Sequence, residues 1–158
     1  MRVLVVEPER VPYEKEIDGN LKSIQEIVDG TIQAVYPYEE LVCLVCNDEG
    51  KINGMPLNRV VPEINDIIAG TFLVCGLGEE SFESLDKKQI DQFKKKFFSP
   101  ELFLPGENGT MVLRNPPSAE EIKWALAKEA ELIPERENEE LKKSGKEQDK
   151  KPKQPRGR

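Results

Sequence analysis

Short apolar runs separated by turn residues fill the first part of the chain, a pattern that predicts β-strands. Residues 2–6 (RVLVV) and 66–75 (DIIAGTFLVC) are the strongest candidates, because β-branched and other apolar residues dominate them. Further strands are expected at residues 12–17 and 31–36. Two β-prone runs also flank residues 47–50 (NDEG), which predicts a hairpin at that turn.

Helical spacing, in which apolar residues recur three and four positions apart, is found in three segments of the chain. The first predicted helix begins after Asn20, a good N-cap, and ends at Gly30. The second begins at Asp86, and Gln89 three residues later completes a capping box. The third covers residues 118–133 and opens with an S-x-x-E box. Its apolar stripe comprises Ile122, Leu126, Ala130 and Ile133, and leaves Trp124 outside.

These elements predict an α+β fold, a small mostly antiparallel sheet of five or six strands with two helices, plus an extra C-terminal helix. The connections are too short for parallel crossovers. We expect a globular domain at residues 1–104, a linker at 105–117, an amphipathic helix at 118–133 and a disordered basic tail at 134–158. Whether the last helix packs on the body or binds a partner stays open at this point.

Charge is distributed unevenly along the 158 residues, and histidine is absent. Residues 134–158 hold nine bases and six acids, a charge of +3, which leaves −10 on residues 1–133 out of the total of −7. An acidic body should repel nucleic acid, whereas the basic tail would contact it weakly. The lack of histidine removes the commonest general base and metal ligand, so catalysis becomes less expected.

The cellular setting follows from apolar runs and cysteines. No apolar run approaches the roughly 20 residues that span a bilayer, so no membrane partner is expected. The start MRVLVVEPER has an apolar run of four residues, which predicts a strand and not a signal peptide. Three cysteines without an export signal indicate free thiols and a cytoplasmic protein.

The stretch Cys43-Leu44-Val45-Cys46 has the C-x-x-C spacing of zinc and redox sites. Side chains of a strand alternate between its two faces, so positions three apart place their sulfur atoms on opposite faces. A metal site needs the ligands together, and a redox pair sits at a helix start. We therefore expect Cys43, Cys46 and Cys75 to be structural core residues, and we expect no metal and no cofactor.

A candidate binding surface centres on Asn58 and Arg59, which follow the predicted hairpin. Arginine suits bidentate recognition of phosphate or carboxylate, and Tyr36 and Tyr38 would lie close by across the sheet. Tyrosine favours binding interfaces. The alternative interpretation pairs this arginine with a local acid such as Glu63 or Asp66.

Several runs of the sequence resemble domain-of-unknown-function family 3846, over residues 1 to about 103. They include MRVLVVEP, VCLVCNDEGKINGMPLNR and DIIAGTFLVCGLGEESFESL. The resemblance implies a small protein of bacteria, phages or mobile elements, and no established activity. Thr71 matches the family's recurring pattern, and we add it to the candidate binding residues.

Three functional hypotheses follow. The first is a non-enzymatic binding module, a phage or mobile-element accessory protein that binds a host protein or a small anionic ligand near Arg59. The second is an acidic DNA mimic that antagonises host restriction, because a body of charge −10 could imitate phosphates. The third is a metal-dependent nucleotide-processing enzyme, although no catalytic constellation is visible. An open sheet edge also allows a homodimer through strand addition.

Overall fold

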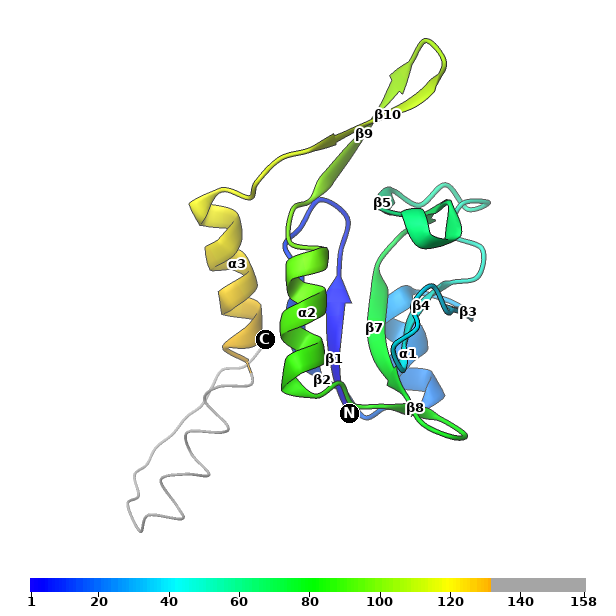
Figure 1. Cartoon of the computed structure of the whole chain (residues 1–158), viewed down its shortest axis with the longest axis vertical. Helices are drawn as coiled ribbons and strands as arrows, with labels where there is room; N and C mark the ends of the chain where they lie inside the picture. Colours follow the sequence, from blue (N-terminus) through cyan, green and yellow to red (C-terminus); the bar gives the residue numbers. More distant parts are fainter. Residues whose placement is uncertain (132–158) are drawn as a thin grey trace.

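A computed structural model describes residues 1–131 of the chain, so the predicted tail at 134–158 lies outside the described residues. The main sheet contains β1 (Arg2–Val6), β2 (Tyr13–Glu16), β3 (Ile32–Val35), β4 (Val42–Asn47), β7 (Phe72–Leu77) and β8 (Phe82–Glu83). Its strands follow the order β2-β1-β7-β4-β3, and β8 pairs with β7 (Figure 1). All these pairs are antiparallel, which confirms the predicted α+β fold.

The hairpin predicted at residues 47–50 is wrong. β4 pairs with β3 and β7, while the next strand, β5 (Leu57–Val61), pairs with β6 (Asp66–Ala69) in a separate two-stranded sheet. A short 3-10 helix, Pro62–Ile64, joins β5 to β6. The six residues of β4 are all buried, so this strand needs a neighbour on each side in the sheet interior. Those neighbours come from distant parts of the sequence, which turn residues alone do not reveal.

The linker predicted at residues 105–117 is also wrong over much of its length. The structure forms a second hairpin there, with β9 (Glu101–Gly106) paired to β10 (Gly109–Arg114). Gly106 and Gly109 flank a two-residue turn, and Gly109 adopts a positive φ of 122° that glycine favours. Proline and glycine gave this stretch the composition of a linker, although β-prone residues lie on both sides of the turn.

The three described helices begin where the sequence predicts. They are α1 (Leu21–Val28), α2 (Lys87–Lys96) and α3 (Ala119–Glu129). The Asn20 side chain accepts a hydrogen bond from the Ser23 N–H, and Asp86 forms a complete capping box. Ser118 caps α3 in the same way. These helix starts depend on contacts within four residues, so local sequence is sufficient to place them.

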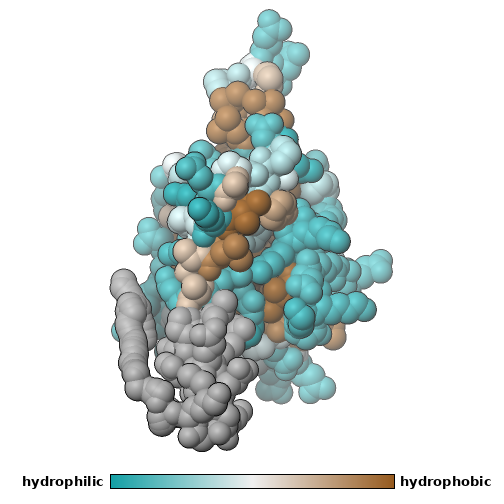
Figure 2. Space-filling view, turned by 90° about the vertical axis from the view of Figure 1, so that its left-hand side faces the viewer, coloured by the Kyte–Doolittle hydropathy of each residue, from teal (hydrophilic) through white to brown (hydrophobic). Residues whose placement is uncertain are grey.

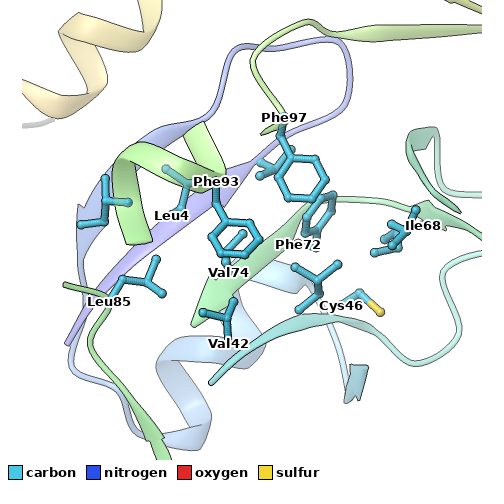
Figure 3. Packing of buried hydrophobic residues seen from close by; sticks show 13 residues of the cluster. Leu4, Val42, Cys46, Ile68, Phe72, Val74, Leu85, Phe93 and Phe97 are labelled. Carbon is cyan, nitrogen blue, oxygen red and sulfur yellow. The ribbon is translucent and has the colours of Figure 1, made fainter. Parts of the chain in front are cut away.

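Side chains pack against both faces of the main sheet. On one face, Phe93 and Phe97 from α2 and its C-cap contact Phe72 and other apolar residues of the strands (Figure 3). The opposite face is covered by α1 and α3. Alternate residues of β1 enter different clusters, with Leu4 on the α2 face and Val5 on the other. A sheet buried on both faces explains why its central strands are continuous apolar runs.

The third helix packs on the body, which answers the question that the sequence left open. Trp124 meets Tyr13 edge to face at 5.5 Å between ring centroids, and the Arg10 guanidinium lies 4.4 Å from the Trp124 ring centroid. Leu126, a member of the predicted apolar stripe, is 58% exposed, whereas Ala125 is buried. The packed side of α3 is therefore rotated relative to the predicted apolar stripe.

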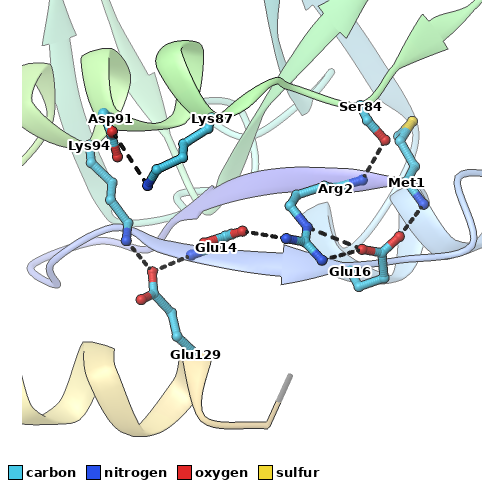
Figure 4. A network of polar contacts seen from close by, with 9 residues as sticks. All are labelled: Met1, Arg2, Glu14, Glu16, Ser84, Lys87, Asp91, Lys94 and Glu129. Carbon is cyan, nitrogen blue, oxygen red and sulfur yellow. Dashed lines mark hydrogen bonds and ion pairs between the residues drawn. The ribbon is translucent and has the colours of Figure 1, made fainter. Parts of the chain in front are cut away.

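Two carboxylates of α3 bind backbone N–H groups next to or within β2. Glu121 accepts hydrogen bonds from the Val11 N–H at 3.3 Å and from Arg10. Glu129 accepts from the Glu14 N–H at 2.8 Å and pairs with Lys94 of α2 at 2.6 Å (Figure 4). Because β2 is an edge strand of the sheet, α3 covers that edge with groups that accept its outward N–H donors.

Candidate functional site

The structure buries the two polar residues at the centre of the predicted binding surface. Asn58 and Arg59 each have 0% of their surface exposed. The Asn58 amide donates to the carbonyl oxygens of Val6 at 2.9 Å and Gly70 at 2.8 Å. This side chain therefore joins the β5–β6 sheet to the main sheet, and a ligand in solvent does not reach it in this structure.

Arg59 connects three segments of the chain. Its guanidinium donates to the carbonyl oxygens of Arg10 at 2.7 Å and Phe97 at 2.8 Å, and to the Asn58 side chain at 2.8 Å. Its Nε is buried without a hydrogen-bond partner. Burial lowers the pKa of Arg59 to about 10, which still leaves the side chain charged at neutral pH.

The acids suggested as alternative partners of this arginine pair with lysines. Glu63 pairs with Lys96 at 2.7 Å, and Asp66 pairs with Lys51. The carboxylate whose charge favours the protonated form of Arg59 is Glu101. It is 4% exposed, accepts a hydrogen bond from the Val60 N–H at 2.8 Å, and binds the Arg114 guanidinium. This buried polar group fixes the base of the β9–β10 hairpin to β5.

Among the remaining predicted residues, Thr71 lies next to Asn58, because the Asn58 amide donates to the carbonyl oxygen of Gly70, the residue before Thr71. Tyr38 packs on Phe93, with ring centroids 5.0 Å apart, and burial raises the pKa of its phenol. Thr71 is half-buried between β6 and β7. Tyr36, by contrast, is 62% exposed and lines a groove beside β3. The structure does not assemble the predicted residues into one site.

The cysteines occupy the core on opposite faces of the sheet. Cys43 belongs to the cluster under α1 and α3, and Cys46 to the cluster under α2. Cys75 lies directly across from Cys43 in the β4–β7 register. Burial raises the pKa of the Cys43 thiol to about 12, so it stays protonated and weakly nucleophilic at neutral pH. Within residues 1–131 no group of three or more potential ligands could hold a metal ion.

The outer edge of β3 offers backbone groups for pairing. β3 is the last strand in the order of the main sheet. Thr31 accepts a hydrogen bond from the Asp48 N–H at 2.8 Å, so Thr31 and every second residue after it bond to β4. The intervening residues, Ile32 and Ala34, therefore direct their N–H and C=O groups outward. They form a short template for an additional strand.

A groove lies on each side of this edge. The first, which we call the Tyr36 groove, has a volume of about 480 Å³ and includes Ile32 of β3 and Tyr36, which directly follows that strand. Its other lining includes Leu21, Ile24, Leu77, Phe82 and the exposed Glu79 and Glu80. The second, the Val35 groove, has a volume of about 270 Å³ and includes Gln33 and Val35 of β3. Its other lining includes Asp48, Glu49, Lys51, Ile52, Ile64 and Asp66.

The two grooves follow the alternation of β3. Residues 32 and 36 face the first groove, and residues 33 and 35 face the second, as the strand period of two requires. The sequence indicated a strand at residues 31–36 and identified Tyr36 as a candidate. It did not indicate that this strand is an edge, because the order of strands depends on pairings with β4 and β7.

Comparison with protein families gives one match. The model of a family described as Domain of unknown function (DUF3846) matches residues 1–98, which is more than half of the chain. Neither the curated proteins nor the solved structures include a significant match. The matched part contains the main sheet and both β3 grooves, while β9, β10 and α3 follow it. Among the described helices, none is both long and apolar enough to cross a membrane.

Proposed function

This chain belongs to the family described as Domain of unknown function (DUF3846), and from that premise we propose that it is a non-enzymatic binding module for an extended segment of a partner protein. The segment would add to β3 as a further antiparallel or parallel strand. We retain the expectation that this chain is an accessory protein of a phage or mobile element and that its partner is a protein of the host cell. A small anionic ligand at Arg59 is left out of this proposal, because that side chain is buried and bonded within the chain.

The open edge of β3 between two grooves is the observation that carries this proposal. In strand addition, backbone hydrogen bonds supply affinity, and pockets that receive alternate side chains supply specificity. Ile32 and Ala34 offer the backbone groups. The grooves lie on the two faces of the same strand, so successive side chains of an added segment would enter them in turn.

The lining of the grooves defines the chemistry of the segment. Apolar residues form much of the Tyr36 groove, which suits an aliphatic or aromatic side chain. Acidic residues occur in both grooves, and the described residues carry 14 bases against 24 acids. We therefore propose a segment in which basic and apolar residues alternate, because opposite charges favour the encounter and like charges oppose it.

The test selects peptides from a random display library on the full-length protein. Enriched peptides should alternate basic and apolar residues, and their affinity is then measured by fluorescence anisotropy. Ala34→Pro removes an outward N–H of β3 while leaving the bonds of Thr31 and Val35 to β4 in place. We expect Ala34→Pro to weaken peptide binding at least tenfold, about 1.4 kcal/mol.

The matched control is Ala34→Ser, which keeps the N–H and should bind as the wild type does. Circular dichroism and thermal unfolding of each variant establish that the sheet is intact. Peptides that bind Ala34→Pro as tightly as the wild type would show that β3 is not the binding edge. A library that yields no enriched peptide would also contradict the proposal.

A further inference from the structure

The β9–β10 hairpin, residues 101–114, projects from the body (Figure 1) and exposes apolar side chains, which contribute to the brown patch near the top of Figure 2. We call it the arm. In its register Leu104 lies opposite Met111 and Leu102 opposite Leu113, which groups these four side chains on one face. Val112 and Phe103 pair on the other face. The exposed apolar residues of the arm are Leu102, Leu104, Met111, Val112 and Leu113.

Within residues 1–131, no other element covers the exposed apolar residues of the arm. α3 follows the arm but packs on β2. Residues 132–158 contain three apolar side chains, Leu132, Ile133 and Leu141, among nine bases and six acids. An isolated two-stranded hairpin with two apolar faces is marginal in water. The addition of further strands would therefore stabilise the arm.

The outer edge of β10 is suited to strand pairing. A two-residue turn makes Gly106 and Gly109 a hydrogen-bonded pair, so residues 109, 111 and 113 bond to β9. Thr110, Val112 and Arg114 consequently direct their backbone N–H and C=O groups outward. All six residues of β10 are exposed, and residues 109–113 contain neither charge nor proline. Natural edge strands normally carry charged residues or proline, which protect them against pairing with another strand.

We propose that β10 pairs antiparallel with β10 of a second copy of this chain, with the two Val112 residues opposite each other on the two-fold axis. In this register Thr110 lies opposite Arg114 of the other copy, so all three outward-facing residues bond across the axis. Met111 and Leu113 also lie opposite each other. The four-stranded sheet thus joins the apolar faces of the two arms into continuous surfaces.

The charges of the arm are compatible with this pairing. No like charges meet along residues 109–114, because Arg114 of each copy lies opposite the uncharged Thr110 of the other. The edge of β3 is different, because its grooves contain Glu79, Glu80 and Asp48, and a second copy would bring like charges together. The two open edges therefore select different partners.

The size of the surface sets the expected strength. A standard interface takes about 20–30 residues from each partner, whereas β9 and β10 have six residues each. We therefore expect a dimer with a dissociation constant in the micromolar range. The arm lies outside residues 1–98 and apart from β3, so this inference does not rest on the proposed function.

Sedimentation equilibrium of the full chain, from about 1 to about 200 µM, tests the proposal across the range where such a dimer forms. The wild type should convert from monomer to dimer as concentration rises. Val112→Lys and Val112→Glu each place two like charges on the axis, and each variant alone should stay monomeric. An equal mixture of the two should form a heterodimer, because opposite charges then meet at the same position.

Leu41→Lys is the matched control, because Leu41 is an exposed apolar residue far from the arm in sequence and should not affect the dimer. Thermal unfolding establishes that the Val112 variants fold, which their exposed position favours. A wild-type monomer at every concentration would overturn the proposal and leave the arm for a different protein. A dimer that persists unchanged in both Val112 variants, or variants whose mixture stays monomeric, would overturn it as well.

Discussion

At the scale of the residue, Arg59 shows how a side chain suited to binding can instead stabilise the fold. Its charged guanidinium donates to carbonyl oxygens of the loop before β2 and of the α2 C-cap. Hydrogen bonds to a buried charged group each contribute about 1.5–3 kcal/mol. Removal of this side chain also leaves the carbonyl groups of Arg10 and Phe97 unpaired in the interior.

We expect Arg59→Ala to lower the free energy of unfolding by about 3 kcal/mol or more, as measured by urea denaturation of the full chain. Arg59→Lys should lose part of this stability, because one ammonium does not reproduce the planar arrangement of donors. Lys22→Ala, at an exposed position of α1, is the control and should change stability little. An Arg59→Ala variant as stable as Lys22→Ala would contradict the structural role.

At the scale of the element, α3 is held by a different set of residues from those in its predicted stripe. Trp124 contacts Tyr13 and Arg10, whereas Leu126 is 58% exposed. We expect Trp124→Ala to cost about 2–3 kcal/mol of unfolding free energy, less than a fully buried aromatic side chain would. Leu126→Ala should cost less than about 0.5 kcal/mol. Equal losses of unfolding free energy in the two variants, measured by urea unfolding, would show that Leu126 contributes to packing as much as Trp124 does.

The elements also show how far the sequence alone predicts this fold. The sequence predicts the helix caps Asn20, Asp86 and Ser118 correctly, because a cap depends on the next three residues. It does not predict the partners of β4, because antiparallel pairing with β3 and β7 is decided by which strands bury both faces. Residues 105–114 of the arm have the composition of a linker, because proline and glycine also occur in tight hairpins.

The candidate site was predicted less completely than the fold. The opposite orientation of Cys43 and Cys46 followed from strand alternation and is confirmed. Asn58 and Arg59 were expected at the surface because polar side chains usually lie there, and only the contacts between sheets reveal their burial. The sequence indicates Tyr36 only through the type of its side chain. Its position between α1 and β8, in the groove beside β3, depends on the assembled sheet.

At the scale of the whole molecule, the two edges of the main sheet differ. α3 covers the β2 edge, where Glu121 and Glu129 accept backbone hydrogen bonds, while the β3 edge is open. The double variant Glu121→Ala/Glu129→Ala should expose the β2 edge. We expect it to form large oligomers as concentration rises, which light scattering would detect, whereas Glu120→Ala/Lys123→Ala on the exposed side of α3 should not.

Scattering that is the same for both double variants would show that α3 does not protect the β2 edge. Thermal unfolding of the two variants separates edge exposure from general loss of structure, because only a folded protein with an exposed edge tests the role of the helix.

The covered β2 edge has a consequence for growth. Endless stacking of subunits requires each one to offer two complementary ends, so that every addition regenerates a site for the next. Because α3 covers the β2 edge of the main sheet, a strand that adds to β3 leaves no second open edge on that side of the sheet for a further copy. The helix thus prevents growth into a filament through the main sheet, even when β3 receives a strand as proposed.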